Sequence, residues 1–300
     1  MMDTENTNKT EIRRARPEDR DAVLAFCTNT WEWGDYIEYV WDEWLRNPQG
    51  ALFVATIDEQ SVGLAHMRMV SATEAWLEGM RVDANFRHRG LSKALSEAMI
   101  TEAMNRGATT ARLATESTNV ASITLAEHGH MRRIGSFALH TAEPVTTPSK
   151  RQYGIEALQV ATEADLDDSI DFLNASSNFP LTGGMYYHGF IGYAISGALL
   201  AEKIAAQQVY ILRRWQRLDG LAIAEPRHGR QGAQLSIGYI DGTTESISMI
   251  AYALRTKVVE MGLESVNAWV PDLMMIRDAF TGAEYVWNGS VYYTYERGLT

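Results

Sequence analysis

Hydrophobic and polar residues recur along the chain with two periods, one typical of strands and one of helices. Residues 51–57 and 61–70 are apolar or alternate on either side of a polar turn, as in a β-hairpin. Residues 91–104 instead place apolar side chains three or four positions apart, the spacing of a helix with one buried face. Strands and helices alternate in this way throughout, so the pattern predicts an α/β fold, a mixed sheet with helices on both sides.

The order of predicted elements occurs twice: strand, two helices, a β-meander, helix, strand, helix, strand. Residues 15–27 resemble residues 161–173 at a constant offset, with these matches: Asp19 and Asp165, Asp21 and Asp167, Leu24 and Ile170, Phe26 and Phe172. Three weaker matches follow in the same order, so duplication is favoured over chance similarity. We expect two domains, residues 1–145 and 150–300, joined by the Pro-, Thr- and Ser-rich stretch 142–150.

Composition and charge narrow the class of partner. Hydrophobic residues make up 46% of the 300 positions, enough for two cores. The 38 acidic and 27 basic residues give a net charge of −11, which argues against nucleic acid or an anionic membrane as the main partner. A single cysteine, Cys27, excludes an internal disulfide and a multi-cysteine metal site, and we expect no metal. The polar start and the lack of a long apolar run predict a cytoplasmic, soluble protein. We expect a monomer or a homodimer.

A basic turn precedes the helix of residues 91–104. A predicted strand, residues 77–82, leads to Arg87-His88-Arg89-Gly90, and the helix opens directly after the glycine. The first backbone N–H groups of a helix lack partners within it and, with the positive end of the helix dipole, they bind anions such as phosphate. Gly90 would let the backbone approach such a ligand closely. The alternative is a solvated turn that only caps the helix.

Two sequence blocks resemble a known superfamily. Residues 87–92, Arg-His-Arg-Gly-Leu-Ser, are similar to the acyl-CoA loop of the GCN5-related N-acetyltransferases (GNAT), Arg/Gln-x-x-Gly-x-Gly/Ala after a strand that ends in Val. Ser92 replaces the last Gly or Ala. In the second block, the strand of residues 112–116 is followed by Asn119 at a helix start and by Gly129-His130, where the family usually has Gly-Phe.

The resemblance covers residues 11–140 in sequence and residues 156–298 only as architecture, and it implies two tandem GNAT-like domains. It implies an N-acetyltransferase that moves an acetyl group from acetyl-CoA to a primary amine of a small molecule. Acetyl-CoA would bind in a V-shaped split between the fourth and fifth strands. The residues implied to hold it are the backbone of Met80 and Val82, the loop Arg87, His88, Arg89, Gly90, Leu91 and Ser92, and Asn119.

Glu78 is the candidate catalytic base, because an aliphatic amine is mostly protonated at pH 7 and must lose a proton before it attacks. The resemblance places a base at this position, four residues before Val82. Period-two alternation puts Glu78, Met80 and Val82 on one face of the strand, and Gly79 would leave room for the substrate. We expect a water molecule to relay the proton.

Three alternatives concern this chemistry. Glu78 could be a strand-edge charge paired with Arg68 or Arg81. Weaker candidates for acid–base roles are His128, His130 and Glu116. The tyrosine acid that is frequent in the family has no counterpart near Leu125 and Ala126, which leaves open a non-catalytic acyl-CoA-binding or interaction module.

The acceptor side is predicted in the aromatic and acidic stretch 31–45. Aromatic faces beside carboxylates suit a cationic amine. We assign Trp41 and Trp44 to the core of a helix, and three residues to the acceptor pocket: Trp33, Asp35 and Tyr36. The pattern Gly-Asp-Tyr-x5-Trp-x2-Trp-Leu, with Glu-Gly-x-Arg-Val at 78–82, is similar to the vertebrate histidine N-acetyltransferase branch, which implies a free amino acid as acceptor.

The second half lacks the basic loop. Residues 242–249 contain no arginine and place Glu245 where a pyrophosphate would lie, so we expect no CoA site there. This degenerate domain would be structural or would close the substrate cleft. The Gly- and Tyr-rich segment 178–190 is either a lid or a plain surface loop.

Overall fold

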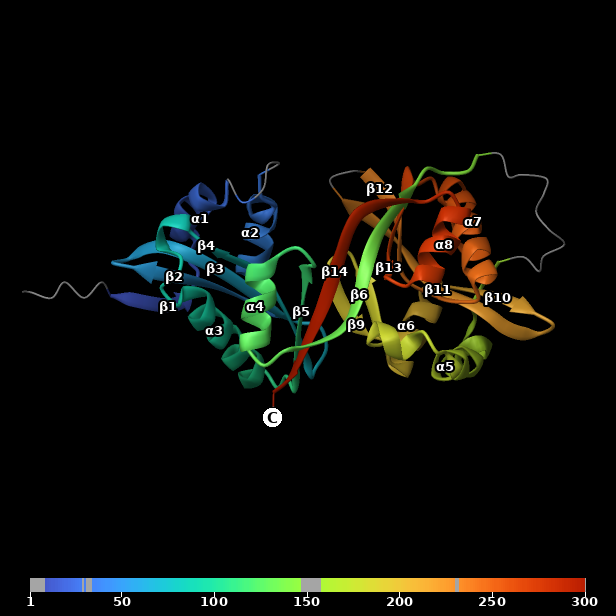
Figure 1. The fold of residues 1–300 in the computed structure, drawn as a ribbon, viewed down its shortest axis with the longest axis horizontal. Helices are drawn as coiled ribbons and strands as arrows, with labels where there is room; N and C mark the ends of the chain where they lie inside the picture. The colour runs from blue at the N-terminus through green and yellow to red at the C-terminus, as the bar shows by residue number, and fades with distance from the viewer. Residues whose placement is uncertain (1–8, 29, 31–33, 147–157, 230–231, 300) are drawn as a thin grey trace, which may run out of the picture. The chain divides into compact units, whose positions relative to one another are not determined.

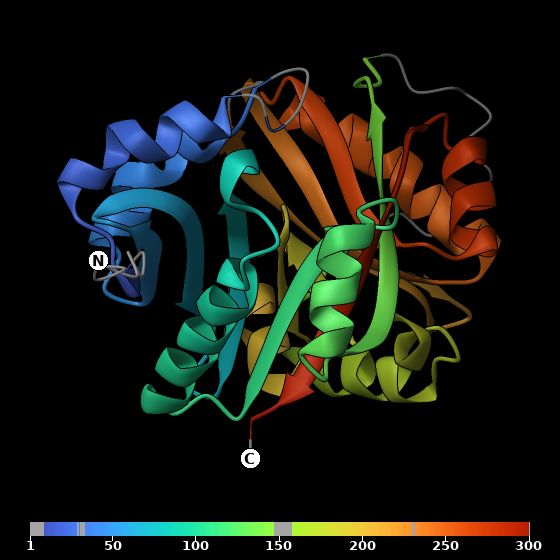
Figure 2. The ribbon, with the colours of Figure 1, turned by 60° about the vertical axis from the view of Figure 1, so that its left-hand side comes forward.

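The computed structural model describes residues 9–28, 30, 34–146, 158–229 and 232–299, which form two compact units (Figures 1 and 2). The described residues of unit 1 are 9–28, 30, 34–114, 119–132 and 295–299. Those of unit 2 are 115–118, 133–146, 158–229 and 232–294.

Unit 1 is a mixed sheet with helices on both faces. Its elements are β1 (Thr10–Arg14), α1 (Arg20–Cys27), α2 (Ile37–Arg46), β2 (Gly50–Ile57), β3 (Gln60–Met69), β4 (Glu74–Val82), α3 (Leu91–Asn105), β5 (Thr110–Glu116) and α4 (Val120–His128). The strands lie in the order β1-β2-β3-β4-β5, antiparallel up to β4, and β4 pairs with β5 in parallel. Trp41 and Trp44 of α2 are buried against Leu64 of β3, which confirms their predicted place in the core. Figure 1 shows α1 and α2 above the strands and α3 below them.

Unit 2 repeats this order of elements, with one hairpin added. Its elements are β6 (Arg132–Ala142), β7 (Gln159–Val160), α5 (Leu166–Ala175), β8 (Met185–His188), β9 (Ile191–Ala194), α6 (Gly197–Ala205), β10 (Val209–Arg214), β11 (Arg217–Gly229), β12 (Gly232–Gly242), α7 (Thr244–Glu260), β13 (Ser265–Pro271), α8 (Met274–Gly282) and β14 (Val286–Gly298). The strand order is β14-β6-β13-β12-β11-β10-β7. One face of this sheet packs on α7 and α8, and the other packs on α5, α6 and the β8–β9 hairpin. The predicted α/β fold with a mixed sheet is confirmed.

The middle of the segment 178–190 is part of the core of unit 2. Met185, Tyr186 and Tyr187 are at most 2% exposed, because the hairpin packs into that core. A side chain at Gly238 would collide with both tyrosines. The predictions of a lid or a plain surface loop are therefore wrong for these three residues, whereas Leu181 and Phe190 of the same segment are exposed.

Each unit contains a strand segment that comes from the other half of the sequence. Residues 133–142 of β6 pair with β13, so they belong to unit 2, although they precede the predicted boundary at residues 145–150. The last residues of β14 belong to unit 1, where the Leu299 amide donates to the Thr109 carbonyl at 2.8 Å. Residues 147–150 of the predicted linker 142–150 lie outside the described residues.

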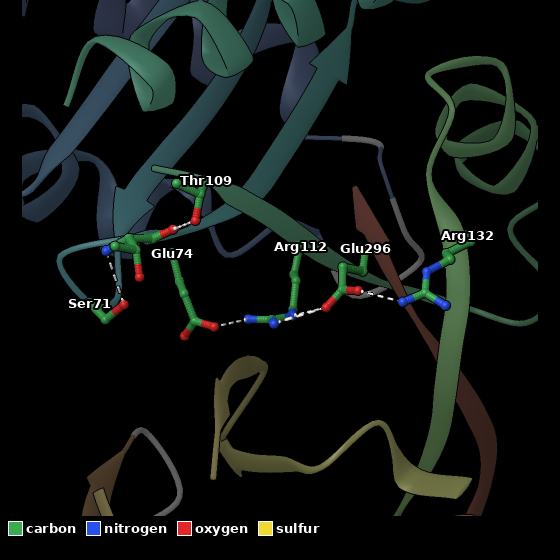
Figure 3. Close-up of polar contacts among 7 residues, drawn as sticks. Ser71, Glu74, Thr109, Arg112, Arg132 and Glu296 are labelled. Atoms are coloured by element: carbon green, nitrogen blue, oxygen red, sulfur yellow. Dashed lines mark hydrogen bonds and ion pairs between the residues drawn. The ribbon is translucent and has the colours of Figure 1, made fainter. Parts of the chain in front are cut away.

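A ladder of alternating charges holds the end of β14 in unit 1 (Figure 3). Arg112 of β5 contacts Glu74 at 2.7 Å on one side and Glu296 of β14 at 2.9 Å on the other. Glu296 also pairs with Arg132 at 3.0 Å. Arg112 is 8% exposed, so its charge needs both carboxylates, and the final strand is therefore a structural part of unit 1.

Candidate active site

The strands β4 and β5 part beside the predicted site. They pair only at their first residues, from Glu74 with Thr110 to Trp76 with Arg112. In the described structure β4 has no strand partner on that side from Leu77 onward. Unpaired backbone groups on a strand can pair with an extended ligand as an added strand would. This is the V-shaped split that the resemblance implies between the fourth and fifth strands.

A β-bulge interrupts β4 within the split. Glu78 pairs with His66 of β3, and Arg81 pairs with Leu64. Gly79 and Met80 of β4 therefore lie opposite one residue of β3, Ala65. Gly79 has φ +71°, a left-handed conformation that favours glycine. Register partners share a face of a sheet. Glu78 and Arg81 therefore lie on one face, with the residues that pack under α1 and α2.

The bulge corrects two expectations. Val82 pairs with Gly63, whose missing Cβ would point at Leu95 of α3, so Val82 lies on the face opposite Glu78. The predicted common face of Glu78 and Val82 is wrong because the extra residue shifts the alternation by one. The space beside Gly79 is also filled, since a Cβ there would lie 2.5 Å from the Trp44 ring.

Glu78 is held through one of its two carboxylate oxygens. Its Oε1 accepts hydrogen bonds from His66 Nδ1 at 2.9 Å and from Arg68 Nε at 2.7 Å. Within the described residues, Oε2 has no hydrogen-bond partner. The other side of the Arg68 guanidinium lies 3.5 Å from Glu43, which is 58% exposed. The predicted pairing of Glu78 with an arginine is confirmed for Arg68, and it leaves one oxygen open to a water molecule or substrate.

The His66 ring, which holds Glu78 by a hydrogen bond, is neutral. Its ring is fully buried and stacks on Trp44, with centroids 4.4 Å apart and planes 4° from parallel. Burial lowers the pKa of His66, although the hydrogen bond to Glu78 acts in the opposite direction. Because an ionised carboxylate only accepts, the hydrogen lies on Nδ1. Nε2 faces Gly50, with no hydrogen-bond partner among the residues described.

The predicted acceptor residues Asp35 and Tyr36 surround Arg81. The Asp35 carboxylate receives Arg81 Nε at 2.8 Å and Arg81 Nη2 at 3.2 Å, and its side chain is only 4% exposed. The Tyr36 ring lies 5.3 Å from the guanidinium carbon, and burial raises the pKa of Tyr36 to about 12. Arg81 also donates to the Met80 carbonyl at 2.9 Å, which ties this cluster to the bulge. Trp33 lies outside the described residues.

The basic turn lies where the sequence places it. Gly90 is the N-cap of α3 with φ +78°, and no side chain caps the helix. Arg87, His88 and Arg89 are exposed, and none of the three forms an ion pair with a described residue. Arg89 stacks on Phe86 at 5.2 Å, and Leu91 turns into the core at 3% exposure. Unused helix N–H groups and uncompensated positive charge thus coincide at this point.

Two of the other named candidates, Asn119 and Glu116, have structural partners. Asn119 caps α4, with its Oδ1 accepting from the Ser122 amide at 3.1 Å, as predicted for a helix start. Glu116 accepts a hydrogen bond from Ser290 at 2.6 Å within unit 2. His128 ends α4, and His130 follows it with φ +58°.

The corresponding helix start in unit 2 is closed to anions. Thr243 caps α7 by accepting from the Ser246 amide at 3.1 Å, and the Ser246 hydroxyl donates to Asp219. Glu245 lies in the first turn and pairs with Arg214 at 2.9 Å. One of the helix N–H groups is thus capped by a side chain and acidic side chains lie beside it, in contrast to the start of α3.

The described part of the chain offers neither a membrane-spanning helix nor a cluster of metal-binding side chains. No helix in it is both long and apolar enough to cross a membrane. No three His, Cys, Asp or Glu side chains in the same residues lie close enough together to hold a metal ion.

The split sheet, the bulge and the basic helix start are accompanied by a family match. Residues 20–130 match the model of the acetyltransferase (GNAT) family. The protein is therefore an acyltransferase by class. Its segment 20–130 is similar to the GNAT acetyltransferases, a family that transfers an acetyl group from acetyl-CoA to an amine. No sequence among the curated proteins matches the chain.

Solved structures show the same fold over nearly the whole chain. A GCN5-related N-acetyltransferase from Sphaerobacter thermophilus is 12% identical with a TM-score of 0.61, over 97% of this chain and 96% of that one. A protein from Thermoplasma acidophilum is 14% identical with a TM-score of 0.58, over 96% and 99%. A glucosamine N-acetyltransferase region of a fungal GH3 β-N-acetylglucosaminidase is 11% identical with a TM-score of 0.63, over 97% of this chain and 38% of that one.

Proposed function

We propose that unit 1 transfers the acetyl group of acetyl-CoA to a primary amine of a small molecule by direct attack. The observation that carries this proposal is the parting of β4 and β5 after Trp76 and Arg112, next to a helix start with free N–H groups and unpaired arginines. An extended, thioester-bearing arm fits the split, and a pyrophosphate fits the helix start.

The donor side uses backbone and positive charge. The backbone of Met80 and Val82 would pair with the pantetheine arm. The basic turn and the first turn of α3 would hold the pyrophosphate through these residues: Arg87, His88, Arg89, Gly90, Leu91 and Ser92. Asn119 opens the next helix and would border the donor site. Gly90 leaves open space in front of the helix, since a Cβ there would meet nothing within 4 Å.

Glu78 would act as the base through its unpaired oxygen. A water molecule on Oε2 would take the proton of the ammonium group and pass it to the carboxylate. The neutral amine then attacks the thioester carbonyl carbon and a C–N bond forms. As the C–S bond breaks, the extra proton on the nitrogen passes to the leaving thiolate, so the N-acetylated amine and the CoA thiol are released. His66 and Arg68 hold Oε1 and thereby fix the direction of Oε2, so we assign them as positioning residues.

The charges near Glu78 favour a cationic acceptor. Three carboxylates and two guanidinium groups lie in this cluster, so one negative charge remains: Asp35, Glu43 and Glu78 against Arg68 and Arg81. A protonated amine would neutralise this excess. We propose that Tyr36 and Trp33 border the acceptor and that Asp35 acts through Arg81. The similarity to the histidine N-acetyltransferase branch supports a free amino acid as the acceptor.

We propose that the second half is a GNAT-like tandem domain that has lost its CoA site. The capped and acidic start of α7 supports this, because Glu245 and Asp219 would repel a pyrophosphate. Its role would be structural or in closing the substrate cleft.

Acetyl-CoA binding tests the donor site. Isothermal titration calorimetry should give one CoA site per chain, and changing both Arg87 and Arg89 to Gln should weaken binding by about 3–6 kcal/mol, because each charge-assisted contact contributes about 1.5–3 kcal/mol. Arg46→Gln, an exposed arginine on α2, is the matched control and should leave the affinity unchanged. Two CoA sites per chain, or full affinity in the double variant, would refute the assignment.

A further inference from the structure

Unit 2 contains a cavity of about 490 Å³ that is wide open to solvent. Its walls come from β6 and β14, from the residues that directly follow β5 and β13, and from Leu181 in the short 3-10 turn Phe179–Thr182. Two backbone hydrogen bonds hold these walls together: the Ser117 amide donates to the Val291 carbonyl at 2.7 Å, and the Asp272 amide donates to the Ser136 carbonyl at 2.9 Å. The volume falls within the range of small-molecule sites, about 300–1,000 Å³.

Arg133 supplies the cavity with positive charge. Its guanidinium stacks on the Tyr293 ring at 4.5 Å, and no carboxylate of the described residues pairs with it. Stacking occupies the face of a guanidinium and leaves the N–H donors in its plane available. The charge of the preceding residue, Arg132, is instead paired with Glu296 at 3.0 Å.

Besides Arg133 and Tyr293, the polar side chains of the cavity belong to two serines and one aspartate. Ser117 and Ser136 bring hydroxyl groups to its lining. Asp272 also lines it, but its Oδ1 already receives Arg277 Nε at 2.5 Å. The Asp272 charge is thus balanced within the protein and the Arg133 charge is not. A ligand of this cavity therefore needs an anionic group, while a positive group is optional.

We propose that this cavity binds a small carboxylate-bearing molecule of amino-acid size. The carboxylate would lie against the edge of Arg133, a planar pairing that suits both groups, with the two serine hydroxyls beside it. Ile134, Leu181 and Val291 would contact the apolar part of the ligand. A free amino acid and its N-acetyl derivative share this carboxylate, and only the free amino acid could also use the second oxygen of Asp272.

Binding to the full chain without acetyl-CoA tests the proposal. Equilibrium dialysis should show binding of amino acids or N-acetyl amino acids and much weaker binding of the matching amino acid amides, which lack the carboxylate. Tighter binding of the free amino acids would indicate that Asp272 takes part, and tighter binding of the acetylated forms would indicate a site for acylated ligands. Equal binding of the amides, or no binding of any carboxylate, would overturn the proposal.

Neighbouring arginines supply the matched variants. Arg133→Gln should weaken binding about 10- to 100-fold, and Tyr293→Leu should weaken it in the same direction by removing the stack. Arg132→Gln should leave binding unchanged, and thermal melts would show that each variant is folded. N-acetyl amino acids lack the ammonium group that the Glu78 site would attract, so Glu78→Gln should bind them normally, and a failure of the acyl-transfer proposal would not be mistaken for a failure of this one. Wild-type affinity in the Arg133 variant would contradict the proposal.

Discussion

Glu78→Gln separates the charge of the proposed base from its position. A glutamine can keep its Oε1 where the carboxylate oxygen lies and still accept from His66 at 2.9 Å and Arg68 at 2.7 Å. Its amide nitrogen then takes the place of Oε2 and cannot accept a proton from the relay water. The change removes basicity while leaving the surrounding contacts in place.

The expected magnitudes follow from these contacts. Loss of the base should lower kcat by about 10²- to 10⁴-fold, the usual contribution of general-base catalysis. Hydrogen bonds to charged groups contribute about 1.5–3 kcal/mol and neutral ones about 0.5–1.5 kcal/mol, so the free energy of unfolding should fall by only about 1–2 kcal/mol. The affinity for acetyl-CoA should not change, because the proposed donor contacts lie elsewhere.

The assay is thiol release from acetyl-CoA with an amine acceptor, measured across pH. Glu43→Gln is the matched control: it removes the same charge next to the same Arg68, at 3.5 Å and with 58% exposure, without touching Glu78. The control should retain nearly full kcat. A Glu78→Gln enzyme with kcat within twofold of wild type would refute the role of Glu78, and an equal loss in both variants would point to general electrostatics instead.

Two further predictions concern stability. Asp35→Ala should lower the free energy of unfolding in urea by about 3–5 kcal/mol, because it leaves Arg81 charged and buried. The double variant with Arg81→Met should recover much of this loss. Losses that simply add in the double variant would show that the pair is not coupled. Burial, aided by the charge of Arg277, lowers the pKa of His140 to about 4. Between about pH 6.5 and pH 4, His140 therefore binds a proton in the unfolded chain but not in the folded chain. Stability should therefore fall by about 1.4 kcal/mol per pH unit from pH 6.5 toward pH 4 on account of this residue, and His140→Leu should remove that part of the slope; an unchanged slope would contradict it.

Local signals were sufficient to predict much of the structure. The start of α3 at Leu91 follows from Gly90, which takes the left-handed conformation that ends the preceding turn. Asn119 caps α4 through its own side chain, as a helix start with asparagine predicts. The buried Trp41 and Trp44 follow from helical periodicity. Each of these features is decided within a few residues of the chain.

Features that depend on distant residues could not be predicted in this way. The bulge at Gly79 depends on how β4 pairs with β3, and it reverses the face on which Val82 lies. Arg81 and Asp35 are 46 residues apart, and the sequence pattern gave each another role. Arg112 and Glu296 are 184 residues apart, so the membership of the last strand in unit 1 is a property of the folded chain.

Mass spectrometry of a panel of amines incubated with acetyl-CoA measures acetyl transfer by unit 1. We predict one acetylated product among small primary amines, formed together with free CoA and lost in the Glu78→Gln enzyme. Acetyl-CoA that binds tightly while every amine stays unmodified would contradict it and would favour a non-catalytic acyl-CoA-binding protein.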